Sequence, residues 1–417
     1  MSKRINPNSG GTPAAKKPHA VKRVQTPAVP PGKVFDLKSS LDEIKAFFEE
    51  YGYAVIQCLT KSECKKLIEE QIREILLKQP LRDQFRLQVF DPNTGKKLDI
   101  DADTDRYIEV LTSANLDAEV RKRYSECWTL HKGFGACCDP QVFHLRLVWA
   151  VRQNPRLYQI AMRILGNAEL WVDINRSIQK LPEMGEHEFA HWDMPYFFVD
   201  AGKPLASLSG KVCYTKSVFR FTPGTHSKAA QQQIKSFYQP LYPGAKPTDA
   251  KFGLSPKIDD PLRLVQRCVA MEIDAGCAVF WHPMLLHGVE KNPKHCAIQF
   301  GHYQGYMLAV DRPEYRALAA SSELEDRIHS YTVGCAPELY PSLDEIHYYP
   351  ARHRIYHNRL KEYIETKMDP THPSITTRVT RKGDIIPHLV PIPDPAYTPP
   401  ELSALGQKLL GIRKWKE

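Results

Sequence analysis

The stretch from His187 to Pro195, HEFAHWDMP, carries two metal-binding patterns that share one histidine. His187 and His191 form H-E-x-x-H, the zinc motif of many metalloproteases, in which two histidines one helical turn apart face the same metal. His191 and Asp193 form H-x-D, the first two ligands of a two-histidine, one-carboxylate iron site. The first pattern requires a helix and the second a strand, so the local secondary structure decides between them.

The residues that surround His191 favour a strand. Bulky apolar side chains occupy every second position after it, at Trp192, Met194, Tyr196 and Phe198. This period of two is typical of a β-strand, on which residues i and i+2 project from the same face. His191 and Asp193 would then point the same way, from a strand that we expect over residues 190–199. The prolines and glycine nearby also disfavour a helix.

A third ligand must come from another part of the chain, because H-x-D alone is too short to be specific. Residues 274–288 contain a turn, a β-type run and then His287, which is followed by Gly288. Between the two segments, residues 219–226 predict a strand that runs into a tight turn at Pro223-Gly224. His191, Asp193 and His287 are therefore the candidate metal ligands.

Two capping patterns predict the helices that begin the ordered part of the chain. Residues 40–43 and 60–63 are boxes of the type S/T-x-x-E, in which two side chains satisfy the first amide groups of a helix. They predict helices over residues 41–50 and 61–78, with a short strand over 53–57 between them. The polar stretch 91–105 predicts a loop.

The second half of the chain changes to short β-type runs from Glu169 onward. A helical block over 142–165, interrupted at Asn154-Pro155, precedes it. The runs cover residues 170–174, 190–199, 212–221, 269–273, 277–281 and 296–303. We interpret the chain as α+β with a mainly β core, in which these runs form a barrel or a jelly roll. Residues 227–261 predict an insertion of mixed structure.

Composition divides the chain into three parts. Residues 1–33 hold seven basic residues, no acidic residue and six prolines, which predicts a disordered basic tail. A large domain follows over 34–370, with its jelly-roll core at about 169–305. Residues 371–417 form a Pro-rich C-terminal extension, in which residues 398–401 cap a short helix.

Charge and cysteine content limit the function classes. The net charge is +9, but the tail supplies seven of these charges, so the body is near +2 and offers no broad basic face. The ten cysteines form no C-x-x-C pair, and no apolar run is long enough for a membrane helix. These features predict an intracellular protein, cytoplasmic or nuclear, with no membrane association. The paired basic clusters of the tail resemble a bipartite nuclear import signal, and a merely solvated tail is the alternative.

Across residues 44–303 the sequence resembles the phytanoyl-CoA dioxygenase-like family of Fe(II)/2-oxoglutarate-dependent oxygenases. The segments that carry the resemblance occur in the family's order and surround the H-x-D and the distal histidine. They are Gly52-Tyr53-Ala-Val-Ile56, Asn154-Pro155, Leu165-Gly166, Lys180-Leu-Pro182 and Phe219-Arg220 followed by Pro223-Gly224-Thr225-His226. The resemblance implies a double-stranded β-helix (a cupin-like jelly roll) with supporting N-terminal helices on one side.

The resemblance also implies a reaction and its cofactors. Fe(II) would be held by His191, Asp193 and His287, which makes these three the implied catalytic residues. Such a site leaves three coordination positions, two for chelating 2-oxoglutarate and one for O2. Oxidation of 2-oxoglutarate to succinate would then be coupled to hydroxylation of a small-molecule or acyl substrate.

One expected residue is missing. The family has an arginine about ten residues after the distal histidine, where it pairs with the C5 carboxylate of 2-oxoglutarate. No arginine lies between His287 and Tyr303 in this chain. Lys180, Arg220 and His295 are the candidate cofactor-binding residues that could take its place, and Lys294 is a further alternative.

Three functions are therefore compatible with the sequence. The first is a dioxygenase that hydroxylates a small organic or acyl substrate. The second is a catalytically degenerate oxygenase fold that serves as a binding or structural module, which the missing arginine favours. The third is a nuclear oxygenase that modifies nucleic acid or protein, which only the basic tail favours. The sequence does not specify an oligomeric state.

Overall fold

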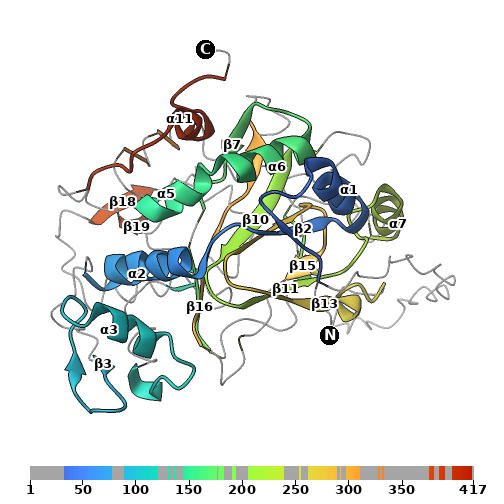
Figure 1. Ribbon diagram of the computed structural model, residues 1–417. Helices are drawn as coiled ribbons and strands as arrows, with labels where there is room; N and C mark the ends of the chain where they lie inside the picture. Colours follow the sequence, from blue (N-terminus) through green and yellow to red (C-terminus); the bar gives the residue numbers. More distant parts are fainter. Residues whose placement is uncertain are drawn as a thin grey trace, which may run out of the picture.

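We analysed a computed structural model of the chain (Figure 1). The residues that the structure describes are 32–77, 89–120, 130–131, 136–137, 144–175, 177–182, 190–193, 205–238, 253–254, 262–288, 292, 297–309, 327–328, 331–332, 375–379, 385–389 and 397–415. The predicted tail therefore lies almost entirely outside the described residues. Within these ranges no helix is both long enough and apolar enough to cross a membrane.

A large mixed sheet forms the centre of the molecule, and it is antiparallel except for its first pair of strands. In spatial order its main path contains β1 (Val34–Asp36), β2 (Tyr53–Gln57), β14 (Cys277–Trp281), β10 (Ser207–Cys213), β16 (Gln299–Tyr303), β8 (Ser177–Lys180), β6 (Ala136–Cys137) and β5 (Leu130–His131). Two more strands, β17 (Tyr306–Leu308) and β7 (Leu170–Val172), join it through β10.

A smaller antiparallel sheet packs against the large one. Its strands, in spatial order, are β12 (Gly253–Leu254), β9 (Ala190–His191), β15 (His287–Gly288), β11 (Ser217–Phe221) and β13 (Val269–Ile273). Aromatic rings join the two sheets: Tyr53 lies 4.6 Å from Phe221, and Phe219 lies 5.2 Å from Trp281, between ring centroids. The face of each sheet that meets the other is called here the inner face.

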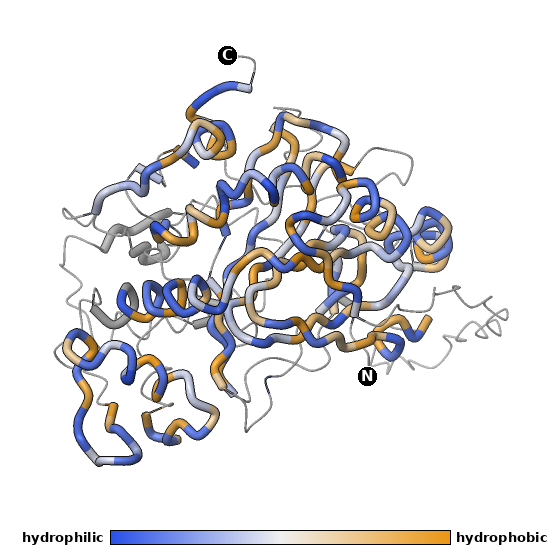
Figure 2. The backbone as a smooth tube through the Cα atoms, in the orientation of Figure 1, coloured by the Kyte–Doolittle hydropathy of each residue, from blue (hydrophilic) through white to orange (hydrophobic). Residues whose placement is uncertain are grey.

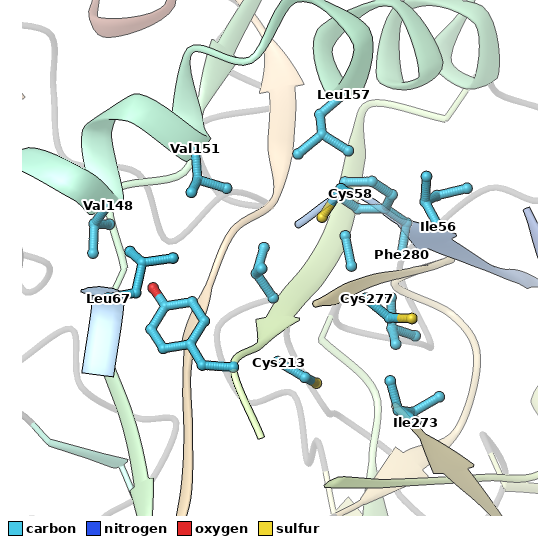
Figure 3. Close-up of a cluster of buried hydrophobic side chains, with 14 of the residues drawn as sticks. Ile56, Cys58, Leu67, Val148, Val151, Leu157, Cys213, Ile273, Cys277 and Phe280 are labelled. Carbon is cyan, nitrogen blue, oxygen red and sulfur yellow. The ribbon is translucent and has the colours of Figure 1, made fainter. Parts of the chain in front are cut away.

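Helices cover the opposite face of the large sheet. They are α1 (Leu41–Tyr51), α2 (Lys61–Leu77), α5 (Arg146–Arg152) and α6 (Pro155–Leu165). Figure 3 shows Leu157 of α6 and Leu67 of α2 in one buried cluster with Ile56 and Phe280 of the sheet. In Figure 2 the helices alternate between hydrophilic and hydrophobic residues, as expected for helices with one buried side.

Alternation along the strands fixes which side chains reach the space between the sheets. Ala278 and Phe280 of β14 pair with Val212 and Gly210 of β10 on the helix-covered face. The odd-numbered residues of both strands, including Trp281, therefore point toward the smaller sheet.

The remaining elements belong neither to the two sheets nor to the helix layer, although α11 contacts β7. They are β3 (Val89–Phe90), β4 (Lys97–Leu98), α3 (Thr104–Leu111), α7 (Lys228–Tyr238), the 3-10 helix Val265–Arg267, β18 (Ile375–Val379), β19 (Ile385–Leu389) and α11 (Ala404–Leu410). The supposed loop 91–105 is a correction to the sequence prediction, because it contains β4 and the start of α3. The predicted insertion of mixed structure, 227–261, contains α7 and the edge strand β12.

The two predicted capping boxes differ in outcome. Thr60 and Glu63 form the box, since the amide of Thr60 donates to Glu63 Oε2 (2.7 Å) and the amide of Glu63 donates to Thr60 Oγ1 (3.2 Å). Ser40 makes no side-chain cap bond, and Glu43 instead binds Lys33 Nζ at 2.6 Å. The box at Ser40 was therefore wrong, although the helix begins where predicted.

Three strand or cap boundaries also differ from the prediction. The run 212–221 is two strands, β10 and β11, separated by a tight bend that moves the chain from the large sheet to the small one. The last helix is capped by Ser403, whose hydroxyl accepts from the amide of Gly406, and not by residues 398–401. The strand at His191 is described for two residues only, and Asp193 follows in a bend.

Candidate metal centre

The structure brings the three predicted ligands together between neighbouring strands. His191 of β9 is the direct register partner of His287 of β15. Asp193 follows β9 and is held in place by its amide, which donates to the carbonyl of Pro283 at 3.0 Å. Its Oδ1 lies 3.2 Å from His191 Nε2 and 3.4 Å from His287 Nε2. Residues almost a hundred positions apart thus form one cluster.

This geometry fits one face of an octahedral metal ion. All three ligand atoms lie within 4.8 Å of one another. Ligands about 2.1 Å from a metal and at right angles to each other are about 3 Å apart, close to the two observed N–O distances. Two imidazoles and one carboxylate are also the donor set of non-haem iron oxygenases. The residues present therefore fit an iron ion.

His287 is held in the orientation that a metal ligand needs. Its ring is almost completely buried, and Nδ1 lies 2.9 Å from the carbonyl oxygen of Leu285. A carbonyl can only accept, so Nδ1 carries a proton and Nε2 is the nitrogen left for a metal. Nε2 lies on the side of Asp193, 3.4 Å from Oδ1, where a metal would bind.

Trp281 holds the carboxylate of Asp193 from the other side. Its indole Nε1 donates to Asp193 Oδ2 at 2.9 Å, which leaves Oδ1 to face the two histidines. Burial by itself would raise the pKa of Asp193, but the adjacent imidazoles of His287 and His191 hold that pKa well below its ordinary value. The carboxylate is therefore ionised and oriented.

The turn after β11 fixes the segment that carries His287. The amide of Thr222 donates to the carbonyl of Leu286, and the amide of Leu286 donates to Thr225 Oγ1, both at 2.8 Å. His226 in the same turn lies 3.1 Å, through Nε2, from the carbonyl of Glu49. The P-G-T-H motif therefore acts as a structural brace for the metal ligand, and its histidine has a packing role.

The three candidate cofactor-binding residues occupy different positions. Lys180 is buried, and alternation in β8 places it on the inner face, opposite Ser177 and Gln179. Arg220 lies on the face of β11 opposite Phe219 and Phe221, whose rings point into the space between the sheets. The structure therefore does not bring Arg220 to the inner face. His295 lies outside the described residues.

At His191, the described end of the alternative zinc motif, the structure has a strand and not the helix that the motif requires. His191 belongs to a strand, and it pairs with a second strand through His287. Its supposed partner His187 and the acidic Glu188 lie outside the described residues. The arrangement at His191 favours the strand interpretation.

Sequence reasoning missed the residues that orient the ligands. Trp281 has no spacing to the ligands that a motif could reveal, because it acts through a hydrogen bond across the fold. Thr225 belongs to the Pro223-Gly224-Thr225-His226 segment that carried the resemblance, but the sequence did not indicate its bond to the Leu286 amide. Trp281 ends a strongly apolar run, so its sequence context does not indicate that the indole N–H makes a functional hydrogen bond.

Comparison with solved structures gives distant similarities. The carbocyclase SnoK from nogalamycin biosynthesis shares 17% identity over 67% of this chain and 88% of its own, with a TM-score of 0.39. The epimerase SnoN, solved with Fe3+, alpha ketoglutarate and nogalamycin RO, shares 15% identity over 64% and 84%, with a TM-score of 0.35. EctD from S. alaskensis, solved with 2-oxoglutarate and 5-hydroxyectoine, shares 15% over 66% and 77%, with a TM-score of 0.34. These TM-scores are too low to support conclusions about the site.

Comparison with protein families gives a direct assignment. No curated protein matches the sequence significantly. The family described as Phytanoyl-CoA dioxygenase (PhyH) matches residues 48–293, which is more than half of the 417 residues and includes all three ligands. This match confirms the resemblance and the cofactor class predicted from it, iron with 2-oxoglutarate. The chain belongs to the phytanoyl-CoA dioxygenase (PhyH) family.

Proposed function

We propose that this protein is an Fe(II)- and 2-oxoglutarate-dependent dioxygenase that hydroxylates a small organic or acyl substrate. The observation that carries the proposal is the convergence of His191 Nε2, Asp193 Oδ1 and His287 Nε2 on one point. Structural ion pairs also bring histidine and carboxylate together, but here two imidazole nitrogens share one oxygen while Trp281 holds the other. That arrangement suits a metal better than a salt bridge.

The residues of the site have separate tasks in this proposal. Iron with 2-oxoglutarate and O2 would supply the oxidising power for the substrate. His191, Asp193 and His287 would hold the ion on one face and leave the opposite face for the ligands. Trp281 would keep the carboxylate from turning, and the carbonyl of Leu285 would keep His287 in the correct tautomer.

We further propose that the fold is the predicted double-stranded β-helix. From β8 to β11 the chain alternates strand by strand between the large and the small sheet, and it does so again from β13 to β16. Two antiparallel sheets formed in this way are the two layers of a jelly roll. The division into a tail, an oxygenase domain and a C-terminal extension remains part of this proposal.

Lys180 is the predicted cofactor residue that we retain. Its burial on the inner face, with the carbonyl of Lys180 fixed by Asn292 Nδ2 at 3.0 Å, suits a positioned cation that contacts a bound oxoacid.

The test is iron-dependent formation of succinate from 2-oxoglutarate by the full-length protein, first alone and then with a panel of acyl and small organic substrates. We expect slow turnover that a true substrate accelerates, and loss of turnover in His287→Ala. His302→Gln is the matched control, since His302 is equally buried but faces the helix layer, where it contacts Tyr214. Binding of iron and 2-oxoglutarate with no succinate under any condition would favour a binding module.

A further inference from the structure

Lys211 is a second lysine on the inner face, partly buried, and no sequence motif pointed to it. It lies in β10, where it pairs with Val279 of β14 and Tyr303 of β16. Its Nζ lies 5.9 Å from the centroid of the Phe219 ring. The Phe219 ring is in turn 6.2 Å from the ring of His287. The ammonium group therefore lies in the same inter-sheet space as the metal ligands.

The ammonium of Lys211 has hydrogen-bond acceptors but no counter-charge. Nζ donates to Ser217 Oγ at 3.2 Å and to the carbonyl of Val218 at 3.0 Å. Among the described residues, no carboxylate lies within ion-pair distance of it. An ammonium has three donors, so one N–H is left to bind a ligand. Burial lowers the pKa of Lys211, as expected for a charge without a partner.

The surface around Lys211 remains accessible, unlike the rest of the strand core. Ser209, Lys211 and Tyr303 on the inner face are each partly exposed. Val212 and His302, on the helix-covered face of the same strands, are completely buried. A small ligand between the sheets could therefore reach Lys211, whereas the opposite face has no accessible surface there.

The register places Lys211 at a suitable distance from the metal site. Its partner Val279 is two residues from Trp281, which binds Asp193. Two residues along a strand span about 7 Å. The four carbon–carbon bonds of a five-carbon diacid span about 5 Å, and a hydrogen bond adds about 2.8 Å. An oxoacid bound to the metal through one end could therefore reach Lys211 with the other.

We propose that Lys211 binds the C5 carboxylate of 2-oxoglutarate, which is the task of the arginine that this chain lacks after His287. This inference rests on the proposed function. It explains why an ammonium without a counter-charge is kept between the two sheets, where partial burial costs stability until an anion binds. Lys180 is a less suitable partner for this carboxylate, because its register partner Gln299 lies four residues along β16 from Tyr303, the partner of Lys211.

The experiment compares two oxoacids on protein loaded with Mn(II), by isothermal titration calorimetry. 2-Oxopentanoate has the same chain length as 2-oxoglutarate and can chelate the metal, but it has no distal carboxylate. The variants are Lys211→Met and Lys211→Arg, with Lys180→Met as the competing site. Lys216→Met is the matched control, since Lys216 lies nearby but is exposed and pairs with Glu272.

We expect the wild type to prefer 2-oxoglutarate, and Lys211→Met to lose about 30-fold in affinity for it, as a charge-assisted hydrogen bond would. Affinities for Mn(II) and for 2-oxopentanoate should not change, and Lys211→Arg should retain the preference. The melting temperature of the ligand-free Lys211→Met protein should rise, because the substitution removes a partly buried charge that has no counter-charge.

Several results would overturn the assignment. One is an unchanged preference for 2-oxoglutarate in Lys211→Met, and another is a loss of affinity for 2-oxoglutarate in Lys180→Met instead. A third is a lower melting temperature of ligand-free Lys211→Met, which would show that the ammonium is a structural group. Equal binding of both oxoacids by the wild type would refute the role of Lys211 while the metal centre stands. Binding of Mn(II) with no binding of either oxoacid would refute the proposed function itself.

Discussion

At the scale of single residues, the two oxygens of Asp193 have different tasks. Oδ1 faces His191 and His287, whereas Oδ2 accepts the indole N–H of Trp281. Residues that orient a metal ligand in this way typically change metal affinity by one to two orders of magnitude when they are removed. Trp281 is thus a positioning residue, and it never needs to touch the metal.

We therefore expect Trp281→Phe to weaken Mn(II) binding about tenfold, because the ring volume is largely kept while the hydrogen bond to Asp193 is lost. Competition with a chelator measures this affinity. Trp149→Phe is the control, since Trp149 is equally buried and its Nε1 bonds His144 at 3.1 Å, far from the metal ligands in the fold. If both variants bind Mn(II) as the wild type does, Trp281 does not position the carboxylate.

At the scale of elements, two capping patterns of the same type differ in the hydrogen bonds that they form. Residues 40–43 and 60–63 have the same S/T-x-x-E pattern, but only the second forms its hydrogen bonds. We expect Thr60→Ala to lower the free energy of unfolding by about 1 kcal/mol, and Ser40→Ala to have almost no effect. Denaturant unfolding of both variants checks this. A comparable loss in Ser40→Ala would show that Ser40 caps α1 in solution.

The Pro223-Gly224-Thr225-His226 turn that braces His287 gives a second prediction at this scale. Thr225→Val keeps the side-chain shape but removes the acceptor of the buried Leu286 amide. We expect it to cost about 1–3 kcal/mol of unfolding free energy and to weaken Mn(II) binding, because the unsatisfied amide loosens the segment. Thr225→Ser restores the hydroxyl and should restore both properties. A stable Thr225→Val with full metal affinity would contradict the role of the turn.

The sequence allowed the local elements to be predicted better than their ends. β13 and β14 match the predicted runs 269–273 and 277–281, because short apolar runs bounded by turns are a local signal. The division of 212–221 into two strands depends on which sheet each half joins, and no local pattern encodes that. The triad was predictable because H-x-D and His287-Gly288 are recognisable motifs. Trp281 and Lys211 were not, since register across the sheets brings them to the site.

At the scale of the whole molecule, buried histidines make the stability depend on pH. Burial lowers the pKa values of His282 and His302 to about 3, from an ordinary value of 6.5. Both are neutral in the folded protein, while the unfolded chain takes up protons below about pH 6.5. Acid therefore favours the unfolded state, and the full stability is present only above that pH.

We expect the unfolding free energy to fall between pH 6.5 and 5 by at most about 1.4 kcal/mol per pH unit for each such histidine. Denaturant titrations at several pH values measure the slope. His282→Asn should make it shallower, since asparagine can still accept from the Met284 amide that His282 Nδ1 now binds at 3.0 Å. A slope that His282→Asn leaves unchanged would show that this ring is not kept neutral by burial.

The measurement that tests the central claim most directly is an anaerobic optical titration of metal-free protein with Fe(II) and 2-oxoglutarate. Simultaneous binding of both gives a visible charge-transfer band, which neither gives alone. We predict that the band forms in the wild type and is lost in Asp193→Ala and in His287→Ala. The absence of a band in the folded wild-type protein, or a band that survives both substitutions, would contradict the assignment of these residues as the iron ligands.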